Sequence, residues 1–334
     1  VICGSASSWI EKNILSHTGF LGRVSQTLTI EELELQDIKL FWPKKNISTT
    51  EILKTISVTG GVPKYLEEID TKYTAEQNLQ NLCFTKGGFL LEEFEKIFND
   101  LFLRRSENYK KIINLLASGS YNMTEIANHL KFSRSGRLSE YLNELELSGF
   151  IESIQNWNFR NLKDSKEKRF RLKDNYLRFY LKYIEPSINK INRGTYSFES
   201  FYSLKNWPSV VGLQFENIIL NNRSLLQRKL LIEPNEIISD GPYIQKKNSS
   251  GSNGCQIDYL IQTRFDSFYI CEIKASTTII GASVIEDIQQ KIDSLDYLRG
   301  SFRPVLIHVN GVKEEVEKSD FFYKIINFNE LLEN

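Results

Sequence analysis

The hydrophobic and polar positions change their period several times along the chain. A short apolar run at 1–3 and an alternating run at 24–30 predict strands near the beginning. Residues 48–100 instead repeat apolar side chains at helical spacing, with Thr49 and Thr50 placed to cap the first helix. The chain is therefore predicted to begin as mixed α/β structure and to continue as a helical region.

Residues 104–174 follow a pattern of three short helices and a hairpin. The helices are predicted over 109–117, from Thr124 as a cap to Leu130, and from Ser133 as a cap to a stop at Gly149. A strand then begins near residue 150, and a charged segment leads to a second strand that ends at 172. Three helices followed by a basic hairpin are typical of a winged helix-turn-helix.

The last part of the chain, residues 207–334, mixes helical and strand-like patterns. Helices are predicted around 211–219 and 285–295, and an apolar strand is predicted over 304–309. Glycine and serine residues predict a flexible loop over 240–254. This region is therefore predicted to be a separate α/β domain.

Two strand-like runs in this region place charged side chains where the pattern otherwise favours burial. Asp258 lies in one run, and Glu272 and Lys274 lie in the other. Successive strand residues point to opposite faces, so Glu272 and Lys274 point the same way. Burying a carboxylate and an ammonium is costly unless they pair or hold a metal ion. These charged residues are therefore candidates for chemistry.

Composition narrows the class of protein only slightly. The 334 residues suffice for two or three domains, and 42 basic residues balance 42 acidic ones. Residues 104–174 carry 14 basic and 9 acidic residues, which gives this segment a modest positive charge. The four cysteines form no CxxC pair, which argues against a zinc site or disulfide framework and favours a cytoplasmic location. No apolar run is long enough to span a membrane.

The order of acids in the last domain resembles the PD-(D/E)xK family of restriction-endonuclease-like domains. The matching positions, on a helix and two strands, are Glu216, Asp258, Glu272 and Lys274. The resemblance implies that Asp258 and Glu272 bind Mg²⁺, with Glu216 assisting at the catalytic site. It also implies that Lys274 positions or activates the attacking water.

Further groups are within reach of such a site. They are the backbone carbonyl of Ile273 and the side chain of Gln289 or Gln290 on the next predicted helix. An ordinary Glu272–Lys274 ion pair on an edge strand remains open. A relative that keeps the fold only for binding also remains open, because fold alone does not settle activity.

The beginning of the chain resembles part of an AAA-like P-loop ATPase of archaea and bacteria. The resemblance is carried by residues 1–8, Gly22-Arg23, the motif at 60–66 and the run at 170–180. It implies that residues 1–58 are the C-terminal part of an ATPase core and that residues 59–103 form a helical lid. In that family Ser5 and Ser7 are sensor candidates and Arg23 is an arginine-finger candidate. An ordinary turn and a surface arginine remain open for these three residues.

The phosphate-binding motif of such an ATPase, G-x-x-x-x-G-K-[ST], is absent from the sequence. The chain is therefore predicted to be a fragment whose natural N-terminus lies upstream. ATP binding and hydrolysis are expected only of the full-length protein. The same family often ends in a PD-(D/E)xK-like domain, so the resemblance covers nearly the whole chain. The remaining predicted parts are the winged helix-turn-helix with its following helix, a linker and the nuclease-like domain, over 104–185, 186–206 and 207–334.

Basic side chains around the third predicted helix and the hairpin are candidates for contact with double-stranded DNA. They are Lys131, Arg134, Arg137, Lys168 and Arg169. Glu140, Glu144 and Glu146 on the same helix dilute the positive field, so a domain that only packs against its neighbours remains open. Trp157 and Phe159 in the hairpin are candidates for packing rather than base stacking.

These observations support two hypotheses about function. The first is an AAA-like ATPase, in its full-length form, coupled to DNA binding and to Mg²⁺-dependent phosphodiester cleavage. The second is a non-enzymatic regulatory or scaffold protein whose nuclease-like domain only binds nucleic acid or protein. The sequence is compatible with an oligomer and does not identify the substrate.

Overall fold

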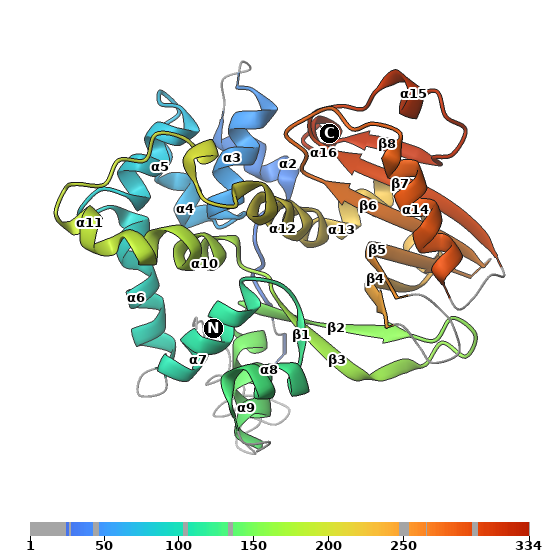
Figure 1. Cartoon of the computed structure of the whole chain (residues 1–334), viewed down its shortest axis with the longest axis horizontal. Helices are drawn as coiled ribbons and strands as arrows, with labels where there is room; N and C mark the ends of the chain where they lie inside the picture. The colour runs from blue at the N-terminus through green and yellow to red at the C-terminus, as the bar shows by residue number, and fades with distance from the viewer. Residues whose placement is uncertain are drawn as a thin grey trace. The chain divides into compact units, whose positions relative to one another are not determined.

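The chain forms two compact units, each assembled from separate stretches of sequence (Figure 1). The computed structural model describes residues 25–26, 28–42, 47–102, 106–132, 136–246, 254–264, 266–295 and 300–333. Within these, the first unit takes the residues up to 33, 62–153 and 169–200, and the second takes 34–61, 154–168 and 201–333. This grouping differs from the boundaries expected from the sequence, because residues 34–61 and the hairpin tip belong with the C-terminal sheet.

The first unit is mainly helical. Its helices are α4 (Pro63–Glu67), α5 (Ala75–Cys83), α6 (Phe89–Phe102), α7 (Ser106–Leu116), α8 (Met123–Leu130), α9 (Gly136–Leu147), α10 (Asn175–Phe179), η5 (Tyr180–Ile184), η6 (Glu185–Ser187) and α11 (Ile188–Asn192). Strand β3 (Asp164–Leu172) lies between β1 (Tyr121–Asn122) and β2 (Ile151–Trp157) in a three-stranded sheet. The predicted order of three helices and a hairpin is therefore present.

The start of α8 shows why a local signal was misassigned. The Asn122 side chain accepts the N–H of Glu125 at 2.8 Å, and the Glu125 carboxylate accepts the N–H of Asn122 at 2.8 Å. In this reciprocal capping box Asn122 is the N-cap, and the helix begins at the next residue, Met123. The prediction that Thr124 is the cap is wrong, because Asn122 already satisfies the first free N–H groups. Ser133 lies outside the described residues.

The strand predicted over 24–30 is not present in the described part of that segment. Residues 25–26 and 28–30 have no regular secondary structure. Leu28 is 77% exposed and Ile30 is 89% exposed. An alternating pattern makes a strand only when a neighbouring strand accepts its hydrogen bonds and a core covers one face. Among the described residues this segment has neither.

The second unit is built on a five-stranded sheet of order β4-β5-β6-β7-β8. The first three strands are antiparallel, and β6, β7 and β8 are parallel. The strands are β4 (Ile237–Gln245), β5 (Cys255–Thr263), β6 (Ser267–Lys274), β7 (Ser301–His308) and β8 (Lys324–Asn327). The loop predicted over 240–254 is wrong for its first six residues, which belong to β4 and include the buried Tyr243.

Helices from both ends of the sequence complete the second unit. They are α2 (Leu35–Ile38), η3 (Lys39–Phe41), α3 (Thr49–Thr59), η7 (Phe201–Ser203), α12 (Trp207–Asn221), α13 (Arg223–Lys229), η8 (Pro234–Glu236), α14 (Ser283–Ser294), α15 (Glu314–Glu317) and α16 (Phe328–Leu331). Ser48 caps α3 by accepting the N–H of Glu51 at 3.2 Å, so the predicted caps Thr49 and Thr50 are helical residues instead. The Gln214 side chain of α12 donates to the carbonyl of Ser57 in α3 at 2.9 Å.

The tip of the β2–β3 hairpin is part of the core of the second unit. Phe159 stacks on Tyr243 with ring centroids 4.9 Å apart and meets Phe268 edge-on at 5.2 Å. The indole N–H of Trp157 donates to Gln262 Oε1 at 2.7 Å, in a fully buried hydrogen bond. The packing expected of Trp157 and Phe159 is therefore present, because both side chains belong to the cluster that covers the sheet.

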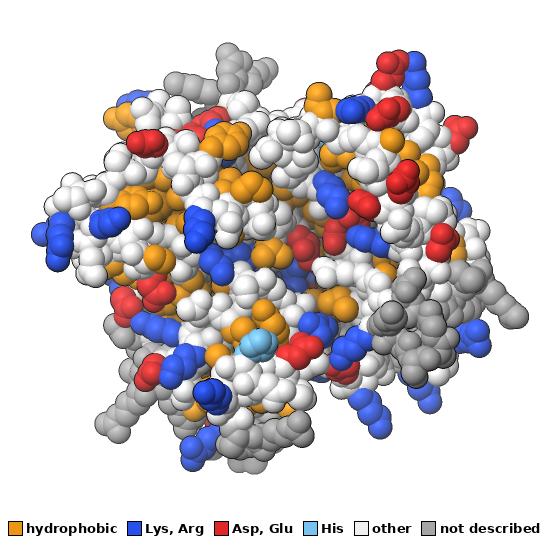
Figure 2. All heavy atoms as spheres, in the orientation of Figure 1, with side chains coloured by type: hydrophobic (Ala, Val, Ile, Leu, Met, Phe, Trp, Pro, Cys, Tyr) orange, Lys and Arg blue, Asp and Glu red, His pale blue; other side chains and the backbone are white. Residues whose placement is uncertain are grey.

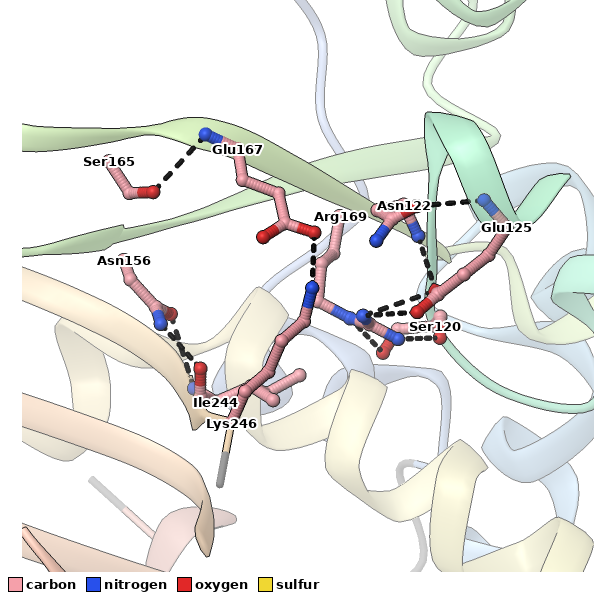
Figure 3. A network of polar contacts seen from close by, with 9 residues as sticks. All are labelled: Ser120, Asn122, Glu125, Asn156, Ser165, Glu167, Arg169, Ile244 and Lys246. Carbon is pink, nitrogen blue, oxygen red and sulfur yellow. Dashed lines mark hydrogen bonds and ion pairs between the residues drawn. The ribbon is translucent and has the colours of Figure 1, made fainter. Parts of the chain in front are cut away.

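Polar contacts fix the same hairpin along its length (Figure 3). The Asn156 side chain accepts the N–H of Ile244 at 3.1 Å and donates to the carbonyl of the same residue at 2.5 Å. Asn156 thus pairs with β4 as another strand would. Lys246 and Glu167 form an ion pair at 2.6 Å nearby. The hairpin is therefore held to the edge of the sheet by hydrogen bonds as well as by buried rings.

Trp157→Ala is expected to destabilise the second unit by about 3–5 kcal/mol, because it empties a buried aromatic site and removes the donor to Gln262. Denaturant unfolding combined with hydrogen exchange of β4 and β5 measures this loss. Lys166→Ala, on the exposed part of the hairpin, is the matched control and should change stability by less than about 0.5 kcal/mol. Equal stability of the two variants would contradict the packing described here.

Candidate functional site

An open cleft of about 1190 Å³ lies in the second unit between α12, β5, β6 and α14. Its charged lining consists of five acids and two lysines: Glu216, Asp258, Glu272, Asp287, Asp293, Lys274 and Lys291. Acidic and basic side chains lie close together on the face over β6 and α14 in Figure 2. All four residues of the predicted catalytic and metal site are among these, so the fold brings them to one place.

Helix α12 supplies Glu216 from the face that it turns to the cleft. Ser209, Gly212, Leu213 and Glu216 line the cleft at helical spacing. The remaining positions of the helix are largely buried, including Phe215. The burial of the other faces of α12 therefore fixes which way the Glu216 carboxylate faces.

The Asp258 side chain is positioned at the point where the pairing between β5 and β6 ends. The pairing between β5 and β6 stops at Tyr259 and Cys271. Beyond this pair the Oδ2 atom of Asp258 accepts the backbone N–H of Ile273 at 2.9 Å. The side chain thus replaces a main-chain carbonyl as the partner of β6, and this bond holds its carboxylate beside the acids of the neighbouring elements.

Burial, and then the negative charges of Glu272 and Glu216, raise the pKa of Asp258 to about 7. The Lys291 ammonium and the N–H of Ile273 act in the opposite direction but do not outweigh these effects. Asp258 is therefore expected to change its protonation state near neutral pH. Acids held so far from their usual pKa are enriched at functional sites.

Glu272 lies at the centre of the charged group and has only 3% of its side chain exposed. Its Oε1 atom pairs with Lys274 Nζ at 2.7 Å, and its Oε2 atom pairs with Lys291 Nζ. Burial would lower the pKa of Lys274, but the hydrogen bond and charge of Glu272 outweigh it and raise that pKa. Lys274 is therefore an ammonium at neutral pH.

Lys291 is the member of this group that sequence reasoning missed. Gln289 and Gln290 were the residues expected to reach the site from this helix. Gln290 lines the cleft, whereas the Gln289 side chain donates to Asp293 at 2.7 Å. Helical spacing was the available signal, because Lys291 lies three residues after the buried Ile288 on the same side of α14.

Among the residues that the structure describes, no group of three or more His, Cys, Asp or Glu side chains is arranged to hold a metal ion. The chemistry of the donors nevertheless fits a hard cation, because carboxylate oxygens are its preferred ligands. A divalent ion would also relieve the repulsion that raises the pKa of Asp258. Mg²⁺ at Asp258 and Glu272 therefore stays a prediction.

The candidate DNA-binding residues fall into different environments. Lys131, at the end of α8, and Arg137, in the first turn of α9, are both exposed. Lys168 is exposed on β3. Arg134 lies outside the described residues. These side chains remain candidates for phosphate contact.

Arg169 instead belongs to a network within the first unit (Figure 3). Its guanidinium donates to the carbonyl of Ser120 at 2.5 Å and pairs with Glu125 at 3.1 Å. Only 18% of the side chain is exposed. Because Glu125 also caps α8, Arg169 connects β3 to the start of that helix. Its observed contacts are therefore structural ones.

Glu144 and Glu146, which were expected to weaken the positive field of α9, have partners within the first unit. Glu144 accepts a hydrogen bond from the Tyr109 hydroxyl, and Glu146 accepts the N–H of Ser153 at 3.0 Å. These bonds join α9 to α7 and to β2.

The ATP-site candidates Ser5, Ser7 and Arg23 lie outside the described residues, so their roles stay predictions.

Comparison with known proteins supports the helix-turn-helix. Residues 107–153 match the family model described as bacterial regulatory protein, ArsR family. The match runs from α7 through α9 and into β2. The chain therefore contains an ArsR-type winged helix-turn-helix, which suggests DNA binding.

Comparison over longer stretches gives two further similarities. The chain is 30% identical over 219 residues to an uncharacterized protein of Methanocaldococcus jannaschii, an alignment that covers 65% of this chain and 48% of the relative. The chain thus spans about half the length of the curated relative that it matches. The crystal structure of protein VC1899 from Vibrio cholerae aligns with 76% of this chain and 53% of that chain, with a TM-score of 0.31 and 12% identity.

None of the helices in the described parts of the chain combines the length and the apolar character needed to cross a bilayer.

Asp258→Asn is expected to stabilise the protein at about pH 8 and to have little effect at about pH 4. The folded protein keeps the Asp258 proton up to a pKa of about 7, whereas the unfolded chain releases it near pH 4. Stability conferred by the protonated acid is therefore lost as the pH rises between these values. Thermal unfolding at both pH values measures the difference.

The matched control is Asp320→Asn, which changes an exposed acid of the same unit. It should shift the unfolding temperature equally little at both pH values. An Asp258→Asn variant that is no more stable than wild type at the higher pH would show that burial and the neighbouring acids do not disfavour the ionised form of Asp258 in the folded protein.

Proposed function

We propose that this chain is part of a DNA-processing protein. In this proposal the winged helix-turn-helix binds duplex DNA, and the cleft of the second unit cleaves phosphodiester bonds with the help of Mg²⁺. The observation that carries the second part is the gathering of Glu216, Asp258 and Glu272 around one cleft with Lys274. A partly buried cluster of like charges is unfavourable in itself and suits a site that binds a cation.

Asp258 and Glu272 are the residues proposed to bind the ion, with Glu216 beside them. When bound, the ion would neutralise charge on the phosphate and make a bound water more acidic. Because Lys274 is an ammonium at neutral pH, its proposed role is to stabilise negative charge and to position the phosphate. Deprotonation of water by Lys274 fits less well, because a base must first lose its own proton.

The DNA-binding part of the proposal is supported by the ArsR-type helix-turn-helix. Lys131 and Arg137 are exposed at the segment that joins α8 and α9, and Arg134 lies in that segment. Basic side chains at this position can neutralise phosphates on either side of a groove. Coupling to ATP is proposed only for a longer protein and rests on the resemblance carried by residues 1–8, 22–23, 60–66 and 170–180.

A second candidate function is favoured by one specific observation. Both oxygens of Glu272 are paired with lysines, which is also how a buried acid is neutralised in a protein that binds without cleaving. In that case the unit would serve a regulatory or scaffold protein. Salt-sensitive binding of duplex DNA without cleavage would favour this function over the first.

Plasmid DNA incubated with the chain and Mg²⁺ or Mn²⁺ is expected to be cleaved, and a chelator should stop the reaction. Lys274→Ala should slow cleavage by roughly 100-fold or more, because it removes a charge placed beside the phosphate. The control Lys318→Ala changes an exposed lysine of the same unit and should cleave like wild type. Equal rates for wild type and Lys274→Ala would rule out catalysis in this cleft.

Arg137→Ala is expected to weaken binding to duplex DNA and to reduce the slope of log K against log salt by about one, because one phosphate contact is lost. Fluorescence anisotropy at several salt concentrations measures both quantities. Lys86→Ala, an exposed lysine of the first unit, is the control and should leave the slope unchanged. An unchanged slope for Arg137→Ala would place the DNA contact elsewhere.

A further inference from the structure

Two lysines from different elements share the Glu272 carboxylate. Lys274 lies two residues further along the same strand, so its side chain leaves β6 on the same face as Glu272. Lys291 comes instead from α14, and 22% of its side chain is exposed at the cleft. The two ammonium groups therefore neutralise the same acid from separate parts of the fold.

The cleft is negative before any ligand enters. Its five acids and two lysines leave a formal charge of −3 when all are ionised. A phosphodiester carries a negative charge of its own and is repelled from such a surface. A divalent cation is attracted by the same charges. Electrostatics therefore favours an order of binding in which the cation enters before the phosphate.

Cation binding at Glu272 competes with its ion pairs. An oxygen that ligates a hard cation gives up most of its interaction with an ammonium, since both positive groups need the same oxygen and repel each other. Lys274 stays beside the carboxylate because it lies two residues further along the same strand. Lys291 has a long flexible side chain on another element and can turn into the cleft without moving the sheet.

We propose that Lys291 is a phosphate-binding residue that becomes available only when a divalent cation occupies the carboxylates. In the absence of a cation its ammonium neutralises Glu272. With the cation in place, the same ammonium is free to bind a phosphate of the nucleic acid. This inference rests on the proposed function and adds an order of binding and a residue that binds the substrate.

The test measures cation and phosphate binding separately from cleavage. Mn²⁺ binding to the full chain is followed by electron paramagnetic resonance without nucleic acid. Binding of a short single-stranded DNA oligonucleotide, which offers no duplex groove to the helix-turn-helix, is followed by anisotropy with and without Ca²⁺. Lys291→Gln, Lys291→Arg and the exposed control Lys318→Gln are compared with wild type.

Lys291→Gln is expected to bind Mn²⁺ roughly fivefold more tightly than wild type, because a competing cation has been removed. The same variant should lose about tenfold in Ca²⁺-dependent oligonucleotide affinity. Lys291→Arg should recover most of that affinity, and Lys318→Gln should match wild type throughout. Unchanged Mn²⁺ affinity, or full Ca²⁺-dependent DNA affinity, in Lys291→Gln would overturn the role assigned to Lys291.

These outcomes separate the two proposals. If wild type binds Mn²⁺ and cleaves DNA but Lys291→Gln behaves like wild type, only the role of Lys291 fails. If neither wild type nor Asp258→Asn binds Mn²⁺, the proposed metal site is wrong, and the inference about Lys291 fails with it. Thermal unfolding of each variant shows whether the unit is still folded when these affinities are measured.

Discussion

The burial of Glu272 in a central strand is the constraint around which the second unit is organised. A carboxylate removed from water must be neutralised, and here two ammonium groups from β6 and α14 do so. The position of α14 over the sheet is thereby coupled to a charge as well as to apolar packing. Asp258 and Glu216 add negative charge at the same place. The protein thus keeps three neighbouring acids whose negative charges repel one another, which a simple buried ion pair would not require.

Four of the seven charged residues of the cleft could be found from the sequence because each stands out locally. Asp258, Glu272 and Lys274 interrupt apolar strands, and Glu216 interrupts an apolar helix. Lys291 could not be found in that way, since a lysine beside the buried face of an amphipathic helix is ordinary. Its pairing with Glu272 depends on how α14 crosses the sheet, which is a property of the tertiary structure.

The same distinction explains the rest of the fold. The helix-turn-helix was predicted because its helices and caps are encoded within short stretches, although the cap of α8 was assigned to the wrong residue. The place of the hairpin was not predicted, because Trp157 and Gln262 are far apart in the sequence. The alternation at 24–30 shows the opposite failure, in which a strand-like pattern has no partner among the described residues. Local patterns thus identified elements better than they identified which elements meet.

The interleaving of the two units restricts how this chain can be rearranged during evolution or by engineering. The main chain passes from one unit to the other several times, and the sheet of the second unit draws its aromatic cover from residues 154–168, which lie inside the winged helix-turn-helix. A gene fragment starting at residue 201 would encode every strand of the sheet. It would lack Trp157 and Phe159, which belong to the hydrophobic core packed against that sheet. The C-terminal unit is therefore not a portable module, and fusion or recombination has to carry it together with the helices that precede it.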